Sequence, residues 1–87
     1  MADLEIRTRL DFAKKLTKKA GVKAIVYFES IGDLVVQQKG AQDLVSNADL
    51  EVEGFIRKHI AESYPNDGIV GEEHASVEGN SGYTWVI

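Results

Sequence analysis

Two adjacent glutamates give the sequence its clearest chemical signal. Glu72 and Glu73 follow Gly71, directly after the short apolar run Ile69–Val70. Adjacent carboxylates at the end of a buried strand repel each other, and removing one ionised carboxylate from water is costly unless a cation or hydrogen-bond donors compensate. A divalent metal ion would supply that compensation. The pair is therefore a candidate site for a hard cation.

A second stretch, Lys39–Asp49, carries a lysine and two aspartates around a short apolar segment. Carboxylate oxygens suit a hard metal ion, and a lysine ammonium attracts anions. We expect Lys39 and Asp49 to form the other half of one incomplete site with Glu72 and Glu73. The simpler interpretation is local, because a lysine at a strand end is usually just solvated.

Composition limits the size and partners of the protein. Its 87 residues make at most one small domain, and a chain of this length buries only about 60 to 65% of its unfolded surface. A hydrophobic content of 44% with 28% charged residues is typical of a globular chain. The net charge of −4 argues against a nucleic-acid surface, which needs a basic stripe.

The same sequence predicts a cytoplasmic protein that does not contact a membrane. It has no cysteine, so neither a disulfide nor a thiolate metal site is available, which fits a reducing compartment. No stretch approaches the roughly 18 to 20 apolar residues of a membrane span. The first ten residues carry the acidic Asp3 and Glu5 where a signal peptide has a basic start.

Hydrophobic periodicity predicts the elements that position these residues. Apolar side chains at steps of three and four predict one amphipathic helix over residues 3–29. Its expected buried stripe is Leu10, Ala13, Leu16, Ala20, Ala24, Tyr27 and Phe28. Gly21 could instead divide it into two helices, since glycine costs about 1 kcal/mol in a helix interior. The lysines between residues 14 and 23 are expected to keep the outer face solvated, the alternative being a membrane or nucleic-acid contact.

The middle of the chain predicts a strand followed by a second helix. Residues 34–39 are partly β-branched and predict the strand, and Gly40 permits a turn. Leu44–Val45 is expected to be an extended connector or a short paired strand. Ser46 and Asp49 match a capping box, so the second helix is predicted to begin at Ser46.

The second helix is expected to end at Tyr64–Pro65. Its predicted buried stripe is Ala48, Val52, Phe55, Ile56 and Ile60. Glu53 and Arg57, four residues apart, are expected to pair on its outer face. The remaining elements are predicted to be a turn at 66–68, a short central strand at 69–70, an exposed loop at 76–82 and a core strand at 83–87.

Taken together, these motifs resemble those of the inositol monophosphatase-like family of magnesium-dependent phosphatases. The resemblance covers nearly the whole sequence. Its motifs, in order, are Lys39, Asp43-Leu44-Val45-Ser46-Asn47-Ala48-Asp49, Gly71-Glu72-Glu73 and Trp85-Val86-Ile87. In the family the last of these runs directly into D-P-x-D-G-T, which supplies two further metal-binding aspartates. The resemblance implies that residues 1–87 are the amino-terminal part of one α/β domain of the layered α-β-α-β sugar phosphatase type, in helix-strand-helix-strand order, ending just before that motif.

The resemblance also implies roles for single residues. Glu72 matches a metal ligand, although a glutamate in a turn is often only solvated. Glu73 matches the second glutamate of the family pair, and could instead be a structural acceptor. Asp49 matches an aspartate that helps to orient the attacking water, beside its local role in the capping box. Lys39 matches a lysine near the mouth of the active site. Asp43 is interpreted as a turn residue.

The two histidines, His59 and His74, are interpreted as packing or surface residues and receive no role.

The function implied by the resemblance is hydrolysis of a phosphate monoester by water activated by Mg²⁺. The substrate would be inositol 1-phosphate or a related sugar or polyol phosphate, and the family is Li⁺-sensitive and commonly dimeric, which implies a homodimer. The 87-residue chain alone is expected to be inactive. The alternative is a non-catalytic oligomerising or regulatory module that keeps the family's amino-terminal helices without its chemistry.

Overall fold

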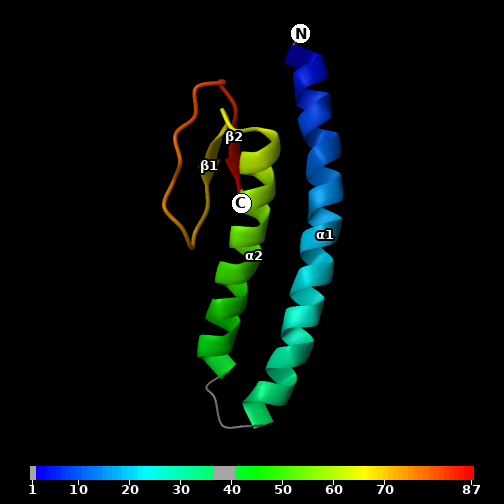
Figure 1. The fold of residues 1–87 in the computed structure, drawn as a ribbon, viewed down its shortest axis with the longest axis vertical. Helices are drawn as coiled ribbons and strands as arrows, with labels where there is room; N and C mark the ends of the chain where they lie inside the picture. The colour runs from blue at the N-terminus through cyan, green and yellow to red at the C-terminus, as the bar shows by residue number, and fades with distance from the viewer. Residues whose placement is uncertain (1, 37–40) are drawn as a thin grey trace.

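The computed structural model describes residues 2–36 and 41–87. Their elements, in chain order, are the helices α1 (Ala2–Val36) and α2 (Ala41–Ser63) and the strands β1 (Gly68–Val70) and β2 (Thr84–Val86). Figure 1 shows the two helices side by side and running in opposite directions, with the short strands beside α2. The described order is therefore helix, helix, strand, strand, and not the alternating order that the sequence predicted.

α1 is one continuous helix, as predicted, but it is longer than the periodicity indicated. It includes Gly21, and it extends through Leu34–Val36, where a strand was predicted. That part of the strand prediction is wrong, because a short apolar run fits a helix or a strand equally well and an existing helix gains a hydrogen bond with each added residue. Residues 37–40, which include Lys39, lie outside the described residues.

α2 begins at Ala41, five residues before the predicted start at Ser46. Leu44–Val45 is therefore helical rather than an extended connector, and Asp43 is a helix residue rather than a turn residue. Ser46 lies inside the helix, so the predicted capping box does not begin it. The predicted end is confirmed, since the helix stops at Ser63 and the Tyr64 amide donates to the carbonyl oxygen of Ile60 at 2.6 Å.

β1 and β2 form a two-stranded parallel sheet in which Ile69 pairs with Trp85. On its other side, Ile69 forms an antiparallel bridge with Val77, with both backbone hydrogen bonds 2.8 Å long. β1 therefore lies between two backbone segments, as a central strand should. Residues 71–83 connect the strands, and Gly82 has a φ of 89°, a backbone conformation that favours glycine.

The core lies where α1, α2 and the strands meet. Leu16, Ile60 and Ile69 are buried there, and they are surrounded by the half-buried side chains of Phe12, Phe55, Ile56 and Trp85. Phe12 packs edge-on against Trp85 with a centroid distance of 5.8 Å. The predicted stripe on α1 is confirmed at Leu16 and wrong at its ends, where Leu10 and Phe28 are exposed.

An ion pair between the half-buried Arg9 and the buried Asp67 joins α1 to the turn before β1. The guanidinium of Arg9 donates two hydrogen bonds, of 2.7 and 2.8 Å, to the carboxylate of Asp67. Ser81 Oγ and Trp85 Nε1 donate to the same carboxylate at 2.5 and 2.9 Å. The predicted turn at residues 66–68 is present, but its aspartate is buried and fully hydrogen-bonded.

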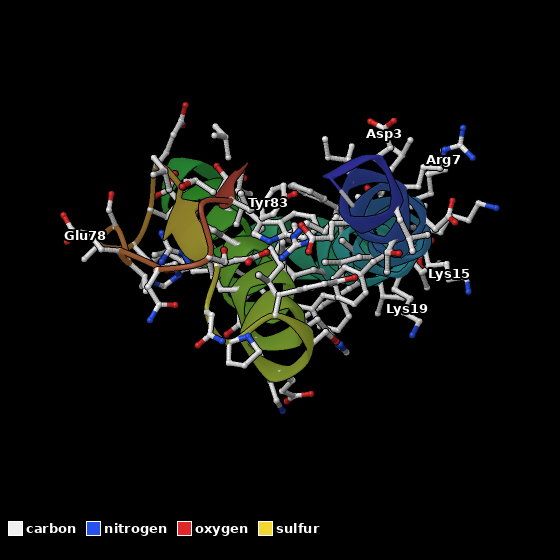
Figure 2. All side chains as sticks on the ribbon, turned by 90° about the horizontal axis from the view of Figure 1, so that it is seen from above. Asp3, Arg7, Lys15, Lys19, Glu78 and Tyr83 are labelled. Atoms are coloured by element: carbon white, nitrogen blue, oxygen red, sulfur yellow. The ribbon has the colours of Figure 1, made fainter. Side chains whose placement is uncertain are left out.

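Charged side chains cover the outer side of α1. Figure 2 shows Arg7, Lys15 and Lys19 pointing away from the rest of the molecule, as predicted for a solvated face. Tyr83 lies on the inner side, where its ring covers the Arg9 guanidinium at 3.9 Å and its hydroxyl donates to Glu5. In residues 2–36 and 41–87, neither helix has a stretch apolar enough and long enough to cross a membrane.

Candidate functional site

Three of the four predicted site residues line one hollow between α2 and the turn after β1. Asp49 comes from α2, and Glu72 and Glu73 come from the turn. The hollow has a volume of about 350 Å³, and its remaining wall is formed by Val52, Glu53, Ile56 and Ile87. Although Asp49 and Glu72 are 23 positions apart in the sequence, the fold brings them to the same surface. The fourth predicted residue, Lys39, lies outside the described residues.

The three acidic side chains are exposed, and their carboxylates accept no hydrogen bond from the described residues. Asp49, Glu72 and Glu73 are all solvent-exposed. Within residues 2–36 and 41–87, no described side chain or backbone group hydrogen-bonds to their carboxylates. Their oxygens therefore remain available to a ligand, in contrast to those of the buried Asp67.

The hollow offers the kind of oxygen donor that Mg²⁺ prefers, but too few donors for a complete site. Carboxylate oxygens are the ligands that a hard divalent cation prefers, and Mg²⁺ takes six ligands in octahedral geometry. Over the part of the chain that the structure describes, no three acidic or histidine side chains come close enough to hold a metal ion by themselves. Asp49, Glu72 and Glu73 therefore offer donors of the kind that a hard cation prefers, but among the described residues they do not make a complete metal site.

Glu53 is a residue of this site that the sequence analysis placed wrongly. It was predicted to pair with Arg57 on the outer face of the second helix. The pair is confirmed, with Arg57 Nε 3.0 Å from Glu53 Oε2, but Glu53 is only 5% exposed and faces the turn after β1. Its carboxylate accepts hydrogen bonds from the backbone amides of Glu73 at 3.1 Å and His74 at 2.9 Å.

Arg57 completes the contact with the same turn. Its Nη1 and Nη2 donate to the carbonyl oxygens of Ala75 at 2.7 Å and His74 at 3.0 Å. Burial raises the pKa of Glu53, but the hydrogen bonds from the Glu73 amide, Arg57 and the His74 amide outweigh it, and the net pKa lies below its usual value. Glu53 is therefore a carboxylate held ionised by its partners.

The sequence did contain a signal for this arrangement. Glu53 lies three residues before Ile56 and seven before Ile60, so it falls on the buried stripe of the helix rather than opposite it. An acidic residue on a buried stripe, with an arginine four positions later, predicts a buried ion pair. The backbone partners could not be predicted, because they come from a turn about 20 residues downstream.

Neither histidine lines the hollow. His59 packs edge-on against Phe55 with a centroid distance of 4.5 Å, and Nε2 of His74 lies 3.2 Å from the carbonyl oxygen of Leu50. These contacts agree with the packing and surface roles that the sequence predicted.

Comparison with known proteins gives a consistent family assignment. The model of the family described as "Inositol monophosphatase family" matches residues 5–87. A protein of Sinorhizobium fredii named "Uncharacterized protein y4fL" is 39% identical over 69 residues, which are 79% of this chain and 25% of that protein. An "Inositol-1-monophosphatase" of Caulobacter vibrioides is 36% identical over 61 residues, which are 69% of this chain and 24% of that protein.

A third relative carries a different kind of name. "Nus factor SuhB" of Vibrio cholerae is 34% identical over 79 residues, which are 90% of this chain and 30% of that protein. The chain thus spans between 24% and 30% of the length of these three relatives. No solved structure gives a significant match. Because the family match extends over residues 5–87, the chain belongs to the inositol monophosphatase family.

Proposed function

We propose that this chain supplies part of the active site of a Mg²⁺-dependent phosphomonoesterase with a layered α/β fold. The observation that carries the proposal is the common hollow lined by Asp49, Glu72 and Glu73. Family membership and the name of the Caulobacter vibrioides relative, inositol-1-monophosphatase, support the same activity.

Each residue has a distinct role in this proposal. Glu72 would bind the metal ion through its carboxylate, and Glu73 would hold a ligand or a water molecule beside it. Asp49, on the opposite wall, orients the attacking water, and Lys39 attracts the phosphate dianion. When bound, Mg²⁺ would neutralise the phosphate oxygens and lower the pKa of the attacking water. Asp49, Glu72 and Glu73 would hold the ion only together with further ligands, because Mg²⁺ takes six.

The proposal extends to the substrate and the setting of the whole protein. The substrate is inositol 1-phosphate or another sugar or polyol phosphate, and Li⁺ inhibits its hydrolysis. The protein acts in the cytoplasm as a homodimer, without a nucleic-acid or membrane partner. The net charge of −4 supports the absence of a nucleic-acid partner.

The test uses the longest protein that the reading frame containing this chain encodes. Phosphate release from inositol 1-phosphate is measured with and without Mg²⁺ and Li⁺. We expect Mg²⁺-dependent release that falls more than about 100-fold in Glu72→Gln, because the amide cannot supply the negative charge of a metal ligand. The 87-residue chain, measured in the same way, is expected to be inactive.

The matched control is Glu78→Gln, which makes the same chemical change at an exposed loop position away from the hollow. Figure 2 shows Glu78 at the outer edge of the loop. This variant should keep wild-type activity. Absence of Mg²⁺-dependent release in the wild type, or equal activity of Glu72→Gln and the wild type, would show the proposal to be wrong.

A second candidate function is a non-catalytic interaction module. The name of the Vibrio cholerae relative, Nus factor SuhB, favours it, since that name denotes a factor rather than an enzyme activity. Exposed apolar side chains along α1, among them Leu4, Ile6 and Leu10, offer a surface for such contacts. A folded protein that releases no phosphate and forms a stable oligomer in light scattering would support this function over the first.

A further inference from the structure

Glu53 and Arg57 form a clamp: their side chains hydrogen-bond to the backbone of the turn that carries Glu72 and Glu73. Glu53 accepts from the consecutive amides of Glu73 and His74, at 3.1 and 2.9 Å. Arg57 donates to the consecutive carbonyl oxygens of His74 and Ala75, at 3.0 and 2.7 Å. We propose that this clamp positions Glu72 and Glu73 for metal binding, an inference that rests on the proposed function.

The hydrogen bonds of Glu53 show that it can position the turn but is not itself available as a metal ligand. Glu53 is part of the wall of the hollow, but its oxygens already accept from Arg57 and from the two amides. The carboxylates of Glu72 and Glu73, in contrast, receive no hydrogen bond from any described group. The buried carboxylate thus fixes the backbone, and the exposed carboxylates next to it stay available to the cation.

Electrostatics favour the same division of roles. A carboxylate as buried as Glu53 needs a cation beside it, and Arg57 lies 3.0 Å away with only 13% of its side chain exposed. Arg57 therefore balances the charge of Glu53 without drawing on the metal ion. The net negative charge that remains at the hollow comes from Asp49, Glu72 and Glu73, which would hold a divalent cation.

The clamp also explains why Gly71 precedes the two glutamates. A Cβ atom at position 71 would lie 2.5 Å from Oε1 and 2.6 Å from Cδ of Glu53. Any larger residue would displace the Glu53 carboxylate or the turn. The close approach that the clamp requires is available only to glycine.

A fixed backbone matters for a metal site because ligands must be held close to their bonding geometry. Groups that hydrogen-bond to ligands or fix their backbone are typically worth about 10- to 100-fold in metal affinity. The variants that test this are Glu53→Gln, which keeps the volume and removes the charge, and Arg57→Lys, which keeps the charge and loses the forked set of donors.

The experiment measures Mg²⁺ affinity by calorimetry without substrate, and hydrogen exchange at the Glu73 and His74 amides. It uses the same protein as the activity test. We expect both variants to bind Mg²⁺ about 10- to 100-fold more weakly and to exchange these two amides faster than the wild type. Asp67→Asn is the matched control: it breaks the buried ion pair with Arg9, away from the hollow, and should reduce stability while leaving Mg²⁺ affinity unchanged.

The outcomes separate this proposal from the proposed function. Unchanged Mg²⁺ affinity in Glu53→Gln and Arg57→Lys, with a loss of stability like that of Asp67→Asn, would overturn the positioning role even if the protein is an active phosphatase. Weaker Mg²⁺ binding in both variants of a protein that releases no phosphate would support the positioning role while the proposed function fails.

Discussion

Asp67 carries a buried negative charge, and its environment determines how stability depends on pH. Hydrogen bonds from Arg9 outweigh the opposing effect of burial, and with Ser81 and Trp85 they lower the pKa of Asp67 from 3.8 to about 2. The hydrogen bonds that Arg9 donates to Asp67 also raise the pKa of Arg9 above its usual value. The folded protein therefore keeps this carboxylate ionised at pH values where the unfolded chain would protonate it.

The sign of the resulting pH dependence follows from linkage. Because the pKa of Asp67 is lower in the folded state, the ion pair stabilises the protein fully above about pH 4, and this stabilisation is lost as the pH falls to about 2. A shift of this size corresponds to about 2 kcal/mol. We expect the free energy of unfolding, measured with urea, to fall by about that amount between pH 5 and pH 2 through this residue.

The variant Asp67→Asn isolates the contribution of the Asp67 charge to the pH dependence of stability. Glu53, whose pKa is also lowered, loses stabilisation over acidic pH in the same direction, so only the difference between the two proteins reports on Asp67. At pH 6 the variant should be about 2 to 3 kcal/mol less stable, since it loses hydrogen bonds between charged groups. The difference should narrow as the pH falls, and a difference that stays constant from pH 5 to pH 2 would contradict the prediction.

At the scale of the elements, replacing Gly21 tests whether the low helix propensity of this glycine reduces the stability of α1. A Cβ atom at this position would have no neighbour within 4 Å. Gly21→Ala should therefore raise the free energy of unfolding by about 1 kcal/mol, because alanine loses less backbone entropy in a helix. Gly71→Ala makes the same change where a Cβ would collide with Glu53, and it should lower stability.

Thermal and urea unfolding of Gly21→Ala and Gly71→Ala measure these changes in the free energy of unfolding. If Gly21→Ala proved neutral or destabilising, the local helix at this position would differ from the one described here.

The elements also show what the sequence could and could not predict. Periodicity over many residues predicted one long helix across Gly21 and the burial of Leu16 and Ile60. A pattern that repeats over many positions outweighs one unfavourable residue such as Gly21. Short local patterns were less informative. Val35 and Val36 are residue types that favour strands, yet α1 extends to Val36, and the capping pattern at Ser46 lies within a helix that begins at Ala41.

The candidate site was predicted to a similar extent. Asp49, Glu72 and Glu73 were predicted from their motifs to belong to one site; the fold brings them to one hollow, and their roles stay predictions. The buried roles of Glu53 and Asp67 were not recognised, because their partners are backbone amides, an arginine and a tryptophan distant in sequence. The pattern around Glu53 indicates the ion pair with Arg57, four residues away, but it carries no information about partners in distant segments of the chain.

At the scale of the whole molecule, burial is concentrated around one region of the helix pair. Phe12 and Leu16 of α1 pack with Ile60 of α2 and with the strands. Further along α1, Val22 is 63% and Ile25 60% exposed, although Lys23 still lies 5.5 Å from the ring centroid of Phe55. The two halves of α1 should therefore differ in local stability, since local stability follows the density of buried apolar contacts.

Hydrogen exchange measured residue by residue tests this difference. Amides of residues 22–29 are expected to exchange at least about tenfold faster than those of residues 12–20, because the buried Leu16 and Ala20 lie in the first stretch and none of the described side chains of the second stretch is fully buried. Equal protection of both stretches at low protein concentration would contradict the prediction. Protection of residues 22–29 that rises with protein concentration would instead show that a second copy covers the exposed side chains of Val22 and Ile25, as expected for the homodimer that we propose.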